Sequence, residues 1–277
     1  MTIRYLNADT GVDTGDGGIG APWLTLAYAH TNSDAGDTLI CQDSTANYAL
    51  ASITWTKNLT IQGEKDDASG AVFDGGGASV RWAMNSGDQT FQKITLQNAN
   101  NNAIFFWSVG AGVTTTFANS KFELNLGSNG TENTYFHINK YEVTLNLQNC
   151  IFNDIGLEAG GGGSLWFIKA FTGTTVLNIT GTTLWLGSTA LTALIDGDIS
   201  ASIVTKNSIV MNATGSTIPF VNESWLSSDV TYSAFYDWSS APTGTGVITS
   251  DPLFVDAANG NFNLRPTSPC IDTGTLT

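Results

Sequence analysis

The sequence has little positive charge. Its 277 residues include 10 Lys and Arg against 24 Asp and Glu, which gives a formal net charge of −14. Nucleic-acid binding needs clustered Lys and Arg to neutralise phosphates, so DNA and RNA are excluded as partners. An acidic surface instead suits neutral glycans, divalent cations, basic patches on other proteins or further copies of this chain.

Cysteine and histidine are equally scarce. The three cysteines, Cys41, Cys150 and Cys270, are odd in number and widely spaced, which predicts buried apolar thiols rather than a disulfide framework. With only His30 and His137 and no Cys pair at ligand spacing, we expect no zinc or other soft-metal site.

Long apolar runs are also absent. No stretch approaches the roughly 18 residues that a membrane helix needs, and the apolar cluster at 103–107 has the length of a strand. The first thirty residues show no basic segment followed by an apolar one, so we predict neither a signal peptide nor a membrane segment.

Alternation of apolar residues with Thr, Asn and Ser dominates the chain, and Gly or Asn interrupts it every few residues. This pattern predicts an all-β protein. The one helix candidate is 22–30, where Pro22 suits a first turn and Leu24, Ala27 and Tyr28 follow helical spacing.

A strand pattern recurs along the chain, with a small polar residue at its corner. The aligned corner residues are Asn98, Asn119, Asn149, Gly181, Asn207 and Ser233. A period of about 20 to 30 residues is typical of a solenoid, in which each turn is a coil of short strands. Asn and Gly suit such corners because they tolerate a positive φ. The alternative is a β-sandwich with Asn-rich turns, whose strands would recur at shorter intervals.

Both ends of the chain carry specific segments. They are 5–13, 22–26 and 35–40 at the beginning, and 251–256, 260–266 and 268–274 at the end. These segments resemble the entry and last coil of right-handed parallel β-helix proteins of the pectate-lyase-like superfamily. The resemblance implies one domain over 1–277, with an N-terminal cap and entry strand (1–40) that includes a short helix, coils (41–250) and a C-terminal coil or cap (251–277). That superfamily includes lyases, hydrolases, epimerases, adhesins and phage spikes, so function has to be argued from sites.

Catalytic candidates are few. Lyases of that superfamily use a Lys or Arg base beside acidic residues that bind Ca²⁺, and no clear cluster of that kind is present. Hydrolases need two carboxylates, and Asp196 with Asp198 is the best pair, because residues i and i+2 of a strand share a face. The alternative is a Gly-centred turn with two solvated carboxylates. Asp154 and Glu158 form a weaker pair with the same alternative.

Binding candidates are an acidic loop and the tryptophans. Asp9, Asp13 and Asp16 offer oxygen ligands for Ca²⁺, but they lack EF-hand spacing, so an Asx/Gly turn that leads to the helix is the preferred interpretation and no cofactor is required. An outward row of Trp could stack on sugar rings or form a subunit interface. The candidates for it are Trp82, Trp107, Trp166 and Trp185. Alternatively, these side chains fill the core.

Two function classes follow. The first hypothesis is a non-enzymatic attachment protein of a phage-like virion, a head-decoration, spike or fibre component. Its partners would be other virion proteins, a cell-surface glycan or itself as a homotrimer, and its location virion or extracellular. The second is a polysaccharide-degrading lyase or hydrolase that acts on a glycan along the coil face. A third possibility is carbohydrate binding without chemistry.

Overall fold

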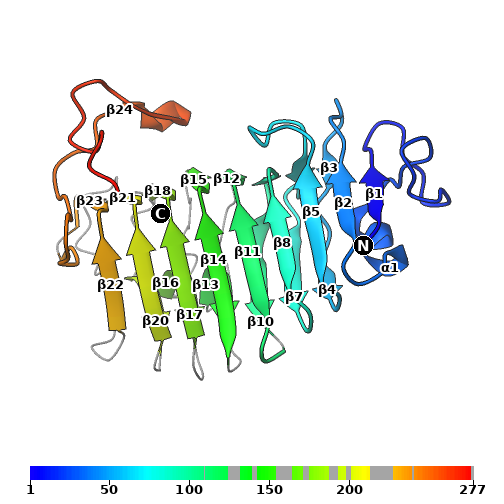
Figure 1. Cartoon of the computed structure of the whole chain (residues 1–277), viewed down its shortest axis with the longest axis horizontal. Helices are drawn as coiled ribbons and strands as arrows, with labels where there is room; N and C mark the ends of the chain where they lie inside the picture. Colours follow the sequence, from blue (N-terminus) through cyan, green and yellow to red (C-terminus); the bar gives the residue numbers. More distant parts are fainter. Residues whose placement is uncertain are drawn as a thin grey trace.

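Three parallel sheets form the body of the molecule, a parallel β-helix (Figure 1). The computed structural model describes residues 1–108, 110–123, 132–138, 142–153, 164–170, 175–186, 193–197, 201–212, 227–238 and 240–275. Each strand pairs in parallel with the equivalent strand of the next coil, which confirms the predicted solenoid and excludes the sandwich.

The three sheets differ in their number of strands. The nine-stranded sheet contains β1 (Ile3–Leu6), β2 (Thr38–Cys41), β5 (Leu59–Gly63), β8 (Gln89–Gln92), β11 (Thr114–Ala118), β14 (Val143–Gln148), β17 (Thr175–Thr180), β20 (Ala201–Lys206) and β22 (Ser227–Thr231). The six-stranded sheet contains β4 (Ile53–Trp55), β7 (Ser79–Met84), β10 (Asn100–Ser108), β13 (Glu132–Ile138), β16 (Ser164–Ala170) and β19 (Ala193–Gly197). The eight-stranded sheet contains β3 (Tyr48–Ala49), β6 (Val72–Asp74), β9 (Thr95–Gln97), β12 (Lys121–Glu123), β15 (Ile151–Asn153), β18 (Thr183–Leu186), β21 (Ile209–Asn212) and β23 (Ala234–Tyr236).

Alternation along each strand separates the core from the surface. In β5, Leu59 and Ile61 are buried while Thr60 and Gln62 are only half-buried. Inward aromatic rings stack along the axis, with Phe91 on Phe117 at a centroid distance of 5.0 Å. Stacked side chains from successive coils thus fill the interior as a continuous apolar column.

Single residues in the left-handed region make the bends between the nine-stranded and eight-stranded sheets. They are Lys93, Asn119, Asn149, Gly181, Asn207 and Tyr232, with φ between 48° and 59°. Asn149 Nδ2 donates to Asn119 Oδ1 at 3.3 Å, so these side chains also link neighbouring coils. The expected corner role is confirmed at Asn119, Asn149, Gly181 and Asn207.

Two of the six predicted corners are wrong. Asn98 follows β9 at a different bend, and the equivalent of Asn119 is Lys93. Ser233 lies one residue beyond the bend at Tyr232, where its hydroxyl accepts from the backbone N–H of Ser208 at 3.2 Å. Lys93 and Tyr232 have no local preference for a positive φ. Their place in the coil therefore imposes this conformation on them.

The first coil is covered by α1 (Leu26–Asn32). The predicted helix is confirmed, but it begins four residues later than the sequence suggests, because Thr25 is its N-cap and accepts from Tyr28 N at 3.2 Å. Pro22 and Leu24 therefore lie in the preceding loop. At the C-terminal end of α1, Lys57 Nζ donates to the carbonyls of His30, Thr31 and Ser33 at 2.7–2.9 Å.

His30 makes this cap sensitive to pH. Its ring contacts Trp55, and Nε2 accepts from Thr56 N at 3.3 Å. Burial and then the charge of Lys57 lower the pKa of His30 below 6.5. Since the folded state binds this proton less well than the unfolded state, the stabilisation is present above pH 6.5 and is lost as the pH falls toward the folded pKa.

We therefore expect the free energy of unfolding to decrease as pH is lowered from 7 toward about 5, a range above most carboxyl titrations. Urea denaturation at several pH values measures this. His30→Gln retains an acceptor for Thr56 but cannot be protonated, so its stability should vary less over the same range. An equal slope in the variant and the wild type would refute the assignment to His30.

The last described segment forms an antiparallel hairpin beside the coils. It contains β24 (Phe254–Asp256), η1 (Ala257–Asn259) and β25 (Asn261–Leu264). The backbone of Thr275 exchanges two hydrogen bonds with the side chain of Asn207, at 2.7 and 3.0 Å, which ties this end to the coil. No helix of the described ranges is long and apolar enough to cross a membrane.

The prediction of buried apolar thiols is confirmed at Cys41 and Cys150 but not at Cys270. Cys41 and Cys150 are buried and unpaired, and Cys270 is half-buried and unpaired. Burial raises the pKa of Cys150 to about 12, so this thiol is inert at neutral pH and serves as a small apolar side chain.

Candidate functional site

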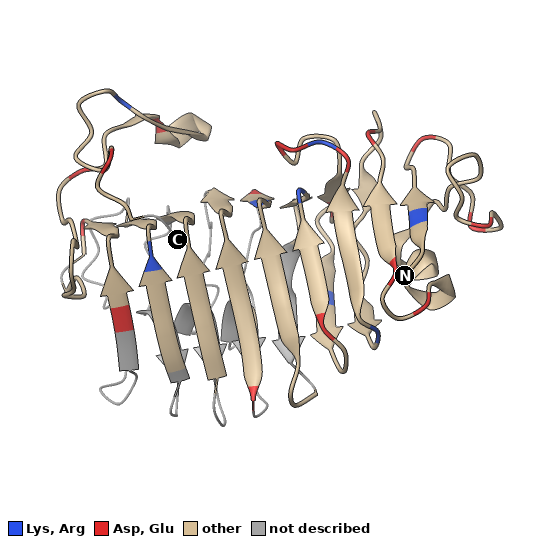
Figure 2. Cartoon of the chain, in the orientation of Figure 1, with Lys and Arg blue, Asp and Glu red and all other residues tan. Residues whose placement is uncertain are grey.

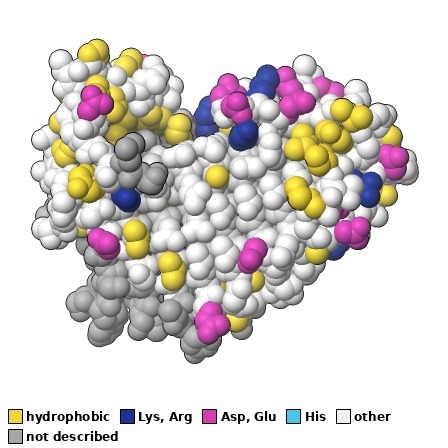
Figure 3. All heavy atoms as spheres, viewed as in Figure 1, with side chains coloured by type: hydrophobic (Ala, Val, Ile, Leu, Met, Phe, Trp, Pro, Cys, Tyr) yellow, Lys and Arg dark blue, Asp and Glu magenta, His cyan; other side chains and the backbone are white. Residues whose placement is uncertain are grey.

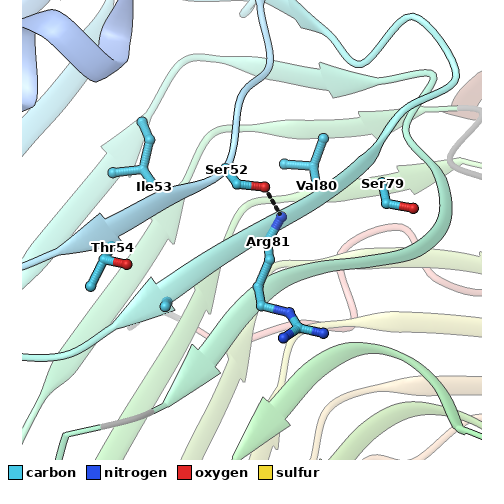
Figure 4. A pocket seen from close by; sticks show the side chains of 7 residues that line it. Ser52, Ile53, Thr54, Ser79, Val80 and Arg81 are labelled. Atoms are coloured by element: carbon cyan, nitrogen blue, oxygen red, sulfur yellow. Dashed lines mark hydrogen bonds between the residues drawn. The ribbon is translucent and has the colours of Figure 1, made fainter.

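A surface cavity of about 530 Å³ lies over β4 and β7 on the outer side of the six-stranded sheet (Figure 4). It is lined by Ser52, Ile53, Thr54, Ser79, Val80, Arg81 and Ala83. Thr54 and Arg81 are exposed because their strand neighbours Trp55 and Trp82 are fully buried. The cavity therefore combines hydroxyl groups with one cation among its described lining residues.

Hydrogen bonds between β7 and the segment before β4 hold this region in place. Arg81 N donates to Ser52 Oγ at 3.0 Å, and Trp82 Nε1 donates to the Ala51 carbonyl at 3.0 Å. In Figure 4 the guanidinium of Arg81 extends away from its backbone bond to Ser52. Core packing thus fixes the strand, while the charged end of Arg81 remains at the surface.

Register pairing brings chemically capable residues into one line across the same sheet. Successive partners are Thr54, Ala83, Trp107, His137, Lys169 and Asp196, which we call the six-strand row. The structure describes the side chains of Thr54 and Ala83 and the backbone positions of the other four. Neighbouring strands are about 4.8 Å apart, so the four positions from 107 to 196 span about 14 Å.

Buried residues alternate with the described members of the row. Ile53 and Trp55 flank Thr54, Trp82 and Met84 flank Ala83, and all four flanking residues are buried. Thr54 is exposed, whereas Ala83 is 8% exposed. Phe136 and Ile138, on either side of position 137, are fully buried.

The predicted carboxylate pair is described only in part. Asp196 lies in β19 and is the register partner of Lys169, whereas Asp198 lies outside the described residues. Asp154 and Glu158 also lie outside them. Sequence reasoning missed the partners of Asp196. His137 and Lys169 carry no motif, and their pairing joins strands that are far apart in the chain.

The predicted tryptophan row is not formed. Trp82 is fully buried and stacks on Phe91 at 4.7 Å, so its assignment to glycan or partner binding is wrong. Trp107 belongs to the six-strand row, and Trp166 pairs with Thr134 and Ala193 at another level of the same sheet. Trp185 lies in the eight-stranded sheet. Differing coil lengths place these residues at different levels.

Trp185 contacts the C-terminal hairpin. Its ring lies 6.3 Å from that of Phe262, which in turn meets Phe254 edge to face at 5.3 Å. The ring is half-buried, so part of it remains at the surface. The contact gives Trp185 a structural role in seating the hairpin on β18.

The three loop aspartates each bind a different part of the N-terminal cap. Asp9 accepts from Thr45 and Ala46, which lowers its pKa. Asp13 accepts from the backbone of Leu24 and Thr25 and from the Thr25 hydroxyl. Asp16 accepts from Gly18 N at 2.7 Å. These contacts fit the turn interpretation, and a Ca²⁺ ion at this loop stays a prediction.

A second charged region follows β5 and is seen as mixed red and blue in Figure 2. Lys65 pairs with Asp43 at 2.8 Å and Lys93 with Asp66 at 2.6 Å. Nearby, burial opposes ionisation of Asp74, but hydrogen bonds from Gln97, Gly76 and Asn98 outweigh it and lower its pKa. These charges are used within the protein, so they tie neighbouring coils together rather than form a reactive centre.

Comparison with known proteins gives similarity at a low level. No protein-family model and no curated protein matches it. Among solved structures, pectate lyase Pel9A aligns over 100% of this chain and 92% of its own, with 14% identity and a TM-score of 0.49. The parallel β-helix itself is established by the strand pairing described above. The GH136 lacto-N-biosidase from Eubacterium ramulus aligns over 90% of this chain and 67% of its own, with 9% identity and a TM-score of 0.36. Similarity at this level says nothing about the activity of this β-helix.

Proposed function

We propose that this β-helix cleaves an acidic polysaccharide by β-elimination, with the glycan lying along the outer face of the six-stranded sheet. The observation that supports this is the six-strand row, which places a histidine, a lysine and an aspartate on three consecutive strands. The cavity at Arg81 lies at the N-terminal end of the same sheet and extends the surface available to a chain of sugars.

The residue types fit elimination. A uronate carries a carboxylate beside the C5 proton, and a cation that binds this carboxylate makes the proton more acidic. His137 accepts the C5 proton, the released electron pair forms the C4=C5 double bond, and the C4–O bond breaks. The leaving oxygen takes a proton back from the imidazolium. Lys169 binds the carboxylate, and Asp196, on the next strand, balances the charge of Lys169.

Histidine suits the base role better than lysine. Its ordinary pKa of about 6.5 leaves it largely neutral at pH 7, whereas lysine is protonated. A hydrolase would instead need two carboxylates about 5 to 9.5 Å apart. Among the register partners of the six-strand row, Asp196 is the one carboxylate.

The test is product formation from polygalacturonate and alginate, followed by the ultraviolet absorbance of the unsaturated uronate. We expect His137→Gln and Lys169→Met each to lower kcat/KM roughly a hundredfold or more. Lys206→Met removes a lysine from the outer face of the nine-stranded sheet and is the matched control, expected to leave the rate unchanged.

Rates that are equal in wild type and both variants would refute the assignment of His137 and Lys169. If the wild type binds these glycans and releases no product, the elimination proposal fails. Binding without cleavage would then support the non-enzymatic attachment role, in a virion or elsewhere, that the sequence also allows.

A further inference from the structure

The outward strand positions of the nine-stranded sheet carry no charge from β5 to β17, although the carboxylate of Asp88 borders them and accepts from Thr114 N at 2.8 Å. These outward positions are Thr60, Gln62, Thr90, Gln92, Thr114, Thr116, Ala118, Thr144, Asn146, Gln148, Val176, Asn178 and Thr180, which together we call the neutral face. Figure 2 shows these strands almost free of red and blue, and Figure 3 shows the same area as a broad polar surface. In a chain of net charge −14 this is an unusual stretch.

Register pairing organises the neutral face into lines of like groups. Thr60, Thr90 and Thr116 are successive partners, and the line continues through Asn146 and Asn178. A second line, two residues further along the strands, contains Gln62 and Gln92. Hydroxyl and amide groups thus repeat along the coil axis at steps of about 4.8 Å.

Hydrogen bonds fix the amides along these lines. Gln92 Nε2 donates to Gln62 Oε1 at 2.7 Å. Asn146 Nδ2 donates to Thr116 Oγ1 at 3.0 Å, and Asn178 Nδ2 donates to Asn146 Oδ1 at 2.8 Å. Each amide has two N–H donors and a carbonyl with two lone pairs, so the ladder leaves hydrogen-bonding capacity directed outward. A ligand therefore meets donors and acceptors that are already ordered.

We propose that the neutral face binds an uncharged, extended β-linked polysaccharide whose chain runs along the coil axis. Such a chain presents hydroxyl groups at intervals close to one strand spacing, so successive sugars meet successive coils. Hydroxyl and amide side chains supply both donors and acceptors for sugar hydroxyls. The site lies on a different sheet from the six-strand row and is independent of the elimination chemistry proposed there.

Two other classes of ligand, polyanions and a second copy of the chain, fit this face less well. A polyanion meets no cation among the outward strand positions of this face from β5 to β17, before Lys206 in β20. A second copy of the chain is disfavoured because stable protein interfaces centre on buried aromatic or apolar anchors. On the neutral face only Ala118 and Val176 are apolar.

The experiment measures binding of hydroxyethyl cellulose by affinity electrophoresis and calorimetry. The triple variant Thr60→Val, Thr90→Val and Thr116→Val removes three hydroxyls in one line and keeps the β-branched shape. Thr183→Val, on β18 of the eight-stranded sheet, is the matched control. Thermal unfolding of each variant shows that the fold is kept.

We expect the wild type and Thr183→Val to bind alike, and the triple variant to bind at least tenfold more weakly, because each lost hydrogen bond weakens binding severalfold. Absence of binding by the wild type, or equal binding by the triple variant, would overturn the proposal. So would binding of polygalacturonate at this face, or a dimer by light scattering that the triple variant abolishes. Hydroxyethyl cellulose contains no uronate, so this result is independent of the elimination assay.

Discussion

Replacing Trp82 with alanine should lower the free energy of unfolding by about 3–5 kcal/mol. The indole is fully buried, stacks on Phe91 at 4.7 Å and meets Trp55 edge to face at 5.5 Å. Its Nε1 also donates to the Ala51 carbonyl, which would lose its partner. The variant therefore creates a cavity in the aromatic column and removes a hydrogen bond at its edge.

Urea denaturation followed by circular dichroism measures this loss. Trp185→Ala is the control, because that ring is half-buried and lies at the surface beside Phe262 of the C-terminal hairpin. We expect the control to lose much less stability than Trp82→Ala. A Trp82→Ala protein with unchanged stability and weakened glycan binding would contradict the structural role and restore the binding role suggested by the sequence.

Gly63→Ala should destabilise the protein by about 3 kcal/mol, the upper end for overpacked cores. Gly63 is buried at the end of β5, where a Cβ atom would lie 1.9 Å from the carbonyl oxygen of Lys93 and 3.0 Å from Ala71 Cβ. The obstacle is backbone from a neighbouring coil, which cannot rotate away as a side chain does. The coils would have to separate locally, at the cost of their packing.

Gly20→Ala is the matched control. A Cβ at position 20 meets no atom within 4 Å, so we expect stability to change by less than about 0.5 kcal/mol. Thermal and urea unfolding of both variants compare them directly. Similar stabilities for the two would mean that β5 and the bend at Lys93 move apart easily, against the tight coil stacking described above.

Much of the fold could be predicted because it depends on local preferences. Alternation predicts strands, and Asn119, Asn149, Gly181 and Asn207 form the bends that their tolerance of positive φ indicates. Lys93 and Tyr232 form equivalent bends without that tolerance. Their conformation is imposed by the coils stacked on either side, which is information that no local pattern contains.

The candidate site was less predictable because it depends on pairing between strands far apart in the chain. The aromatic residues looked alike in sequence, yet Trp82 lies in the core while Trp107 lies in the six-strand row. The partnership of His137 with Lys169 follows from the parallel pairing of β13 with β16, which lie in successive coils.

The sequence by itself determined the all-β class, the coil repeat, the capping helix and the apolar role of the buried thiols, because backbone preference and alternation act within a few residues. Only the tertiary structure decided which residues become neighbours along the axis. It brought His137, Lys169 and Asp196 onto consecutive strands and aligned Thr60, Thr90 and Thr116 on the neutral face. The physical reason is that inter-coil register is set by backbone pairing and core stacking over the whole coil.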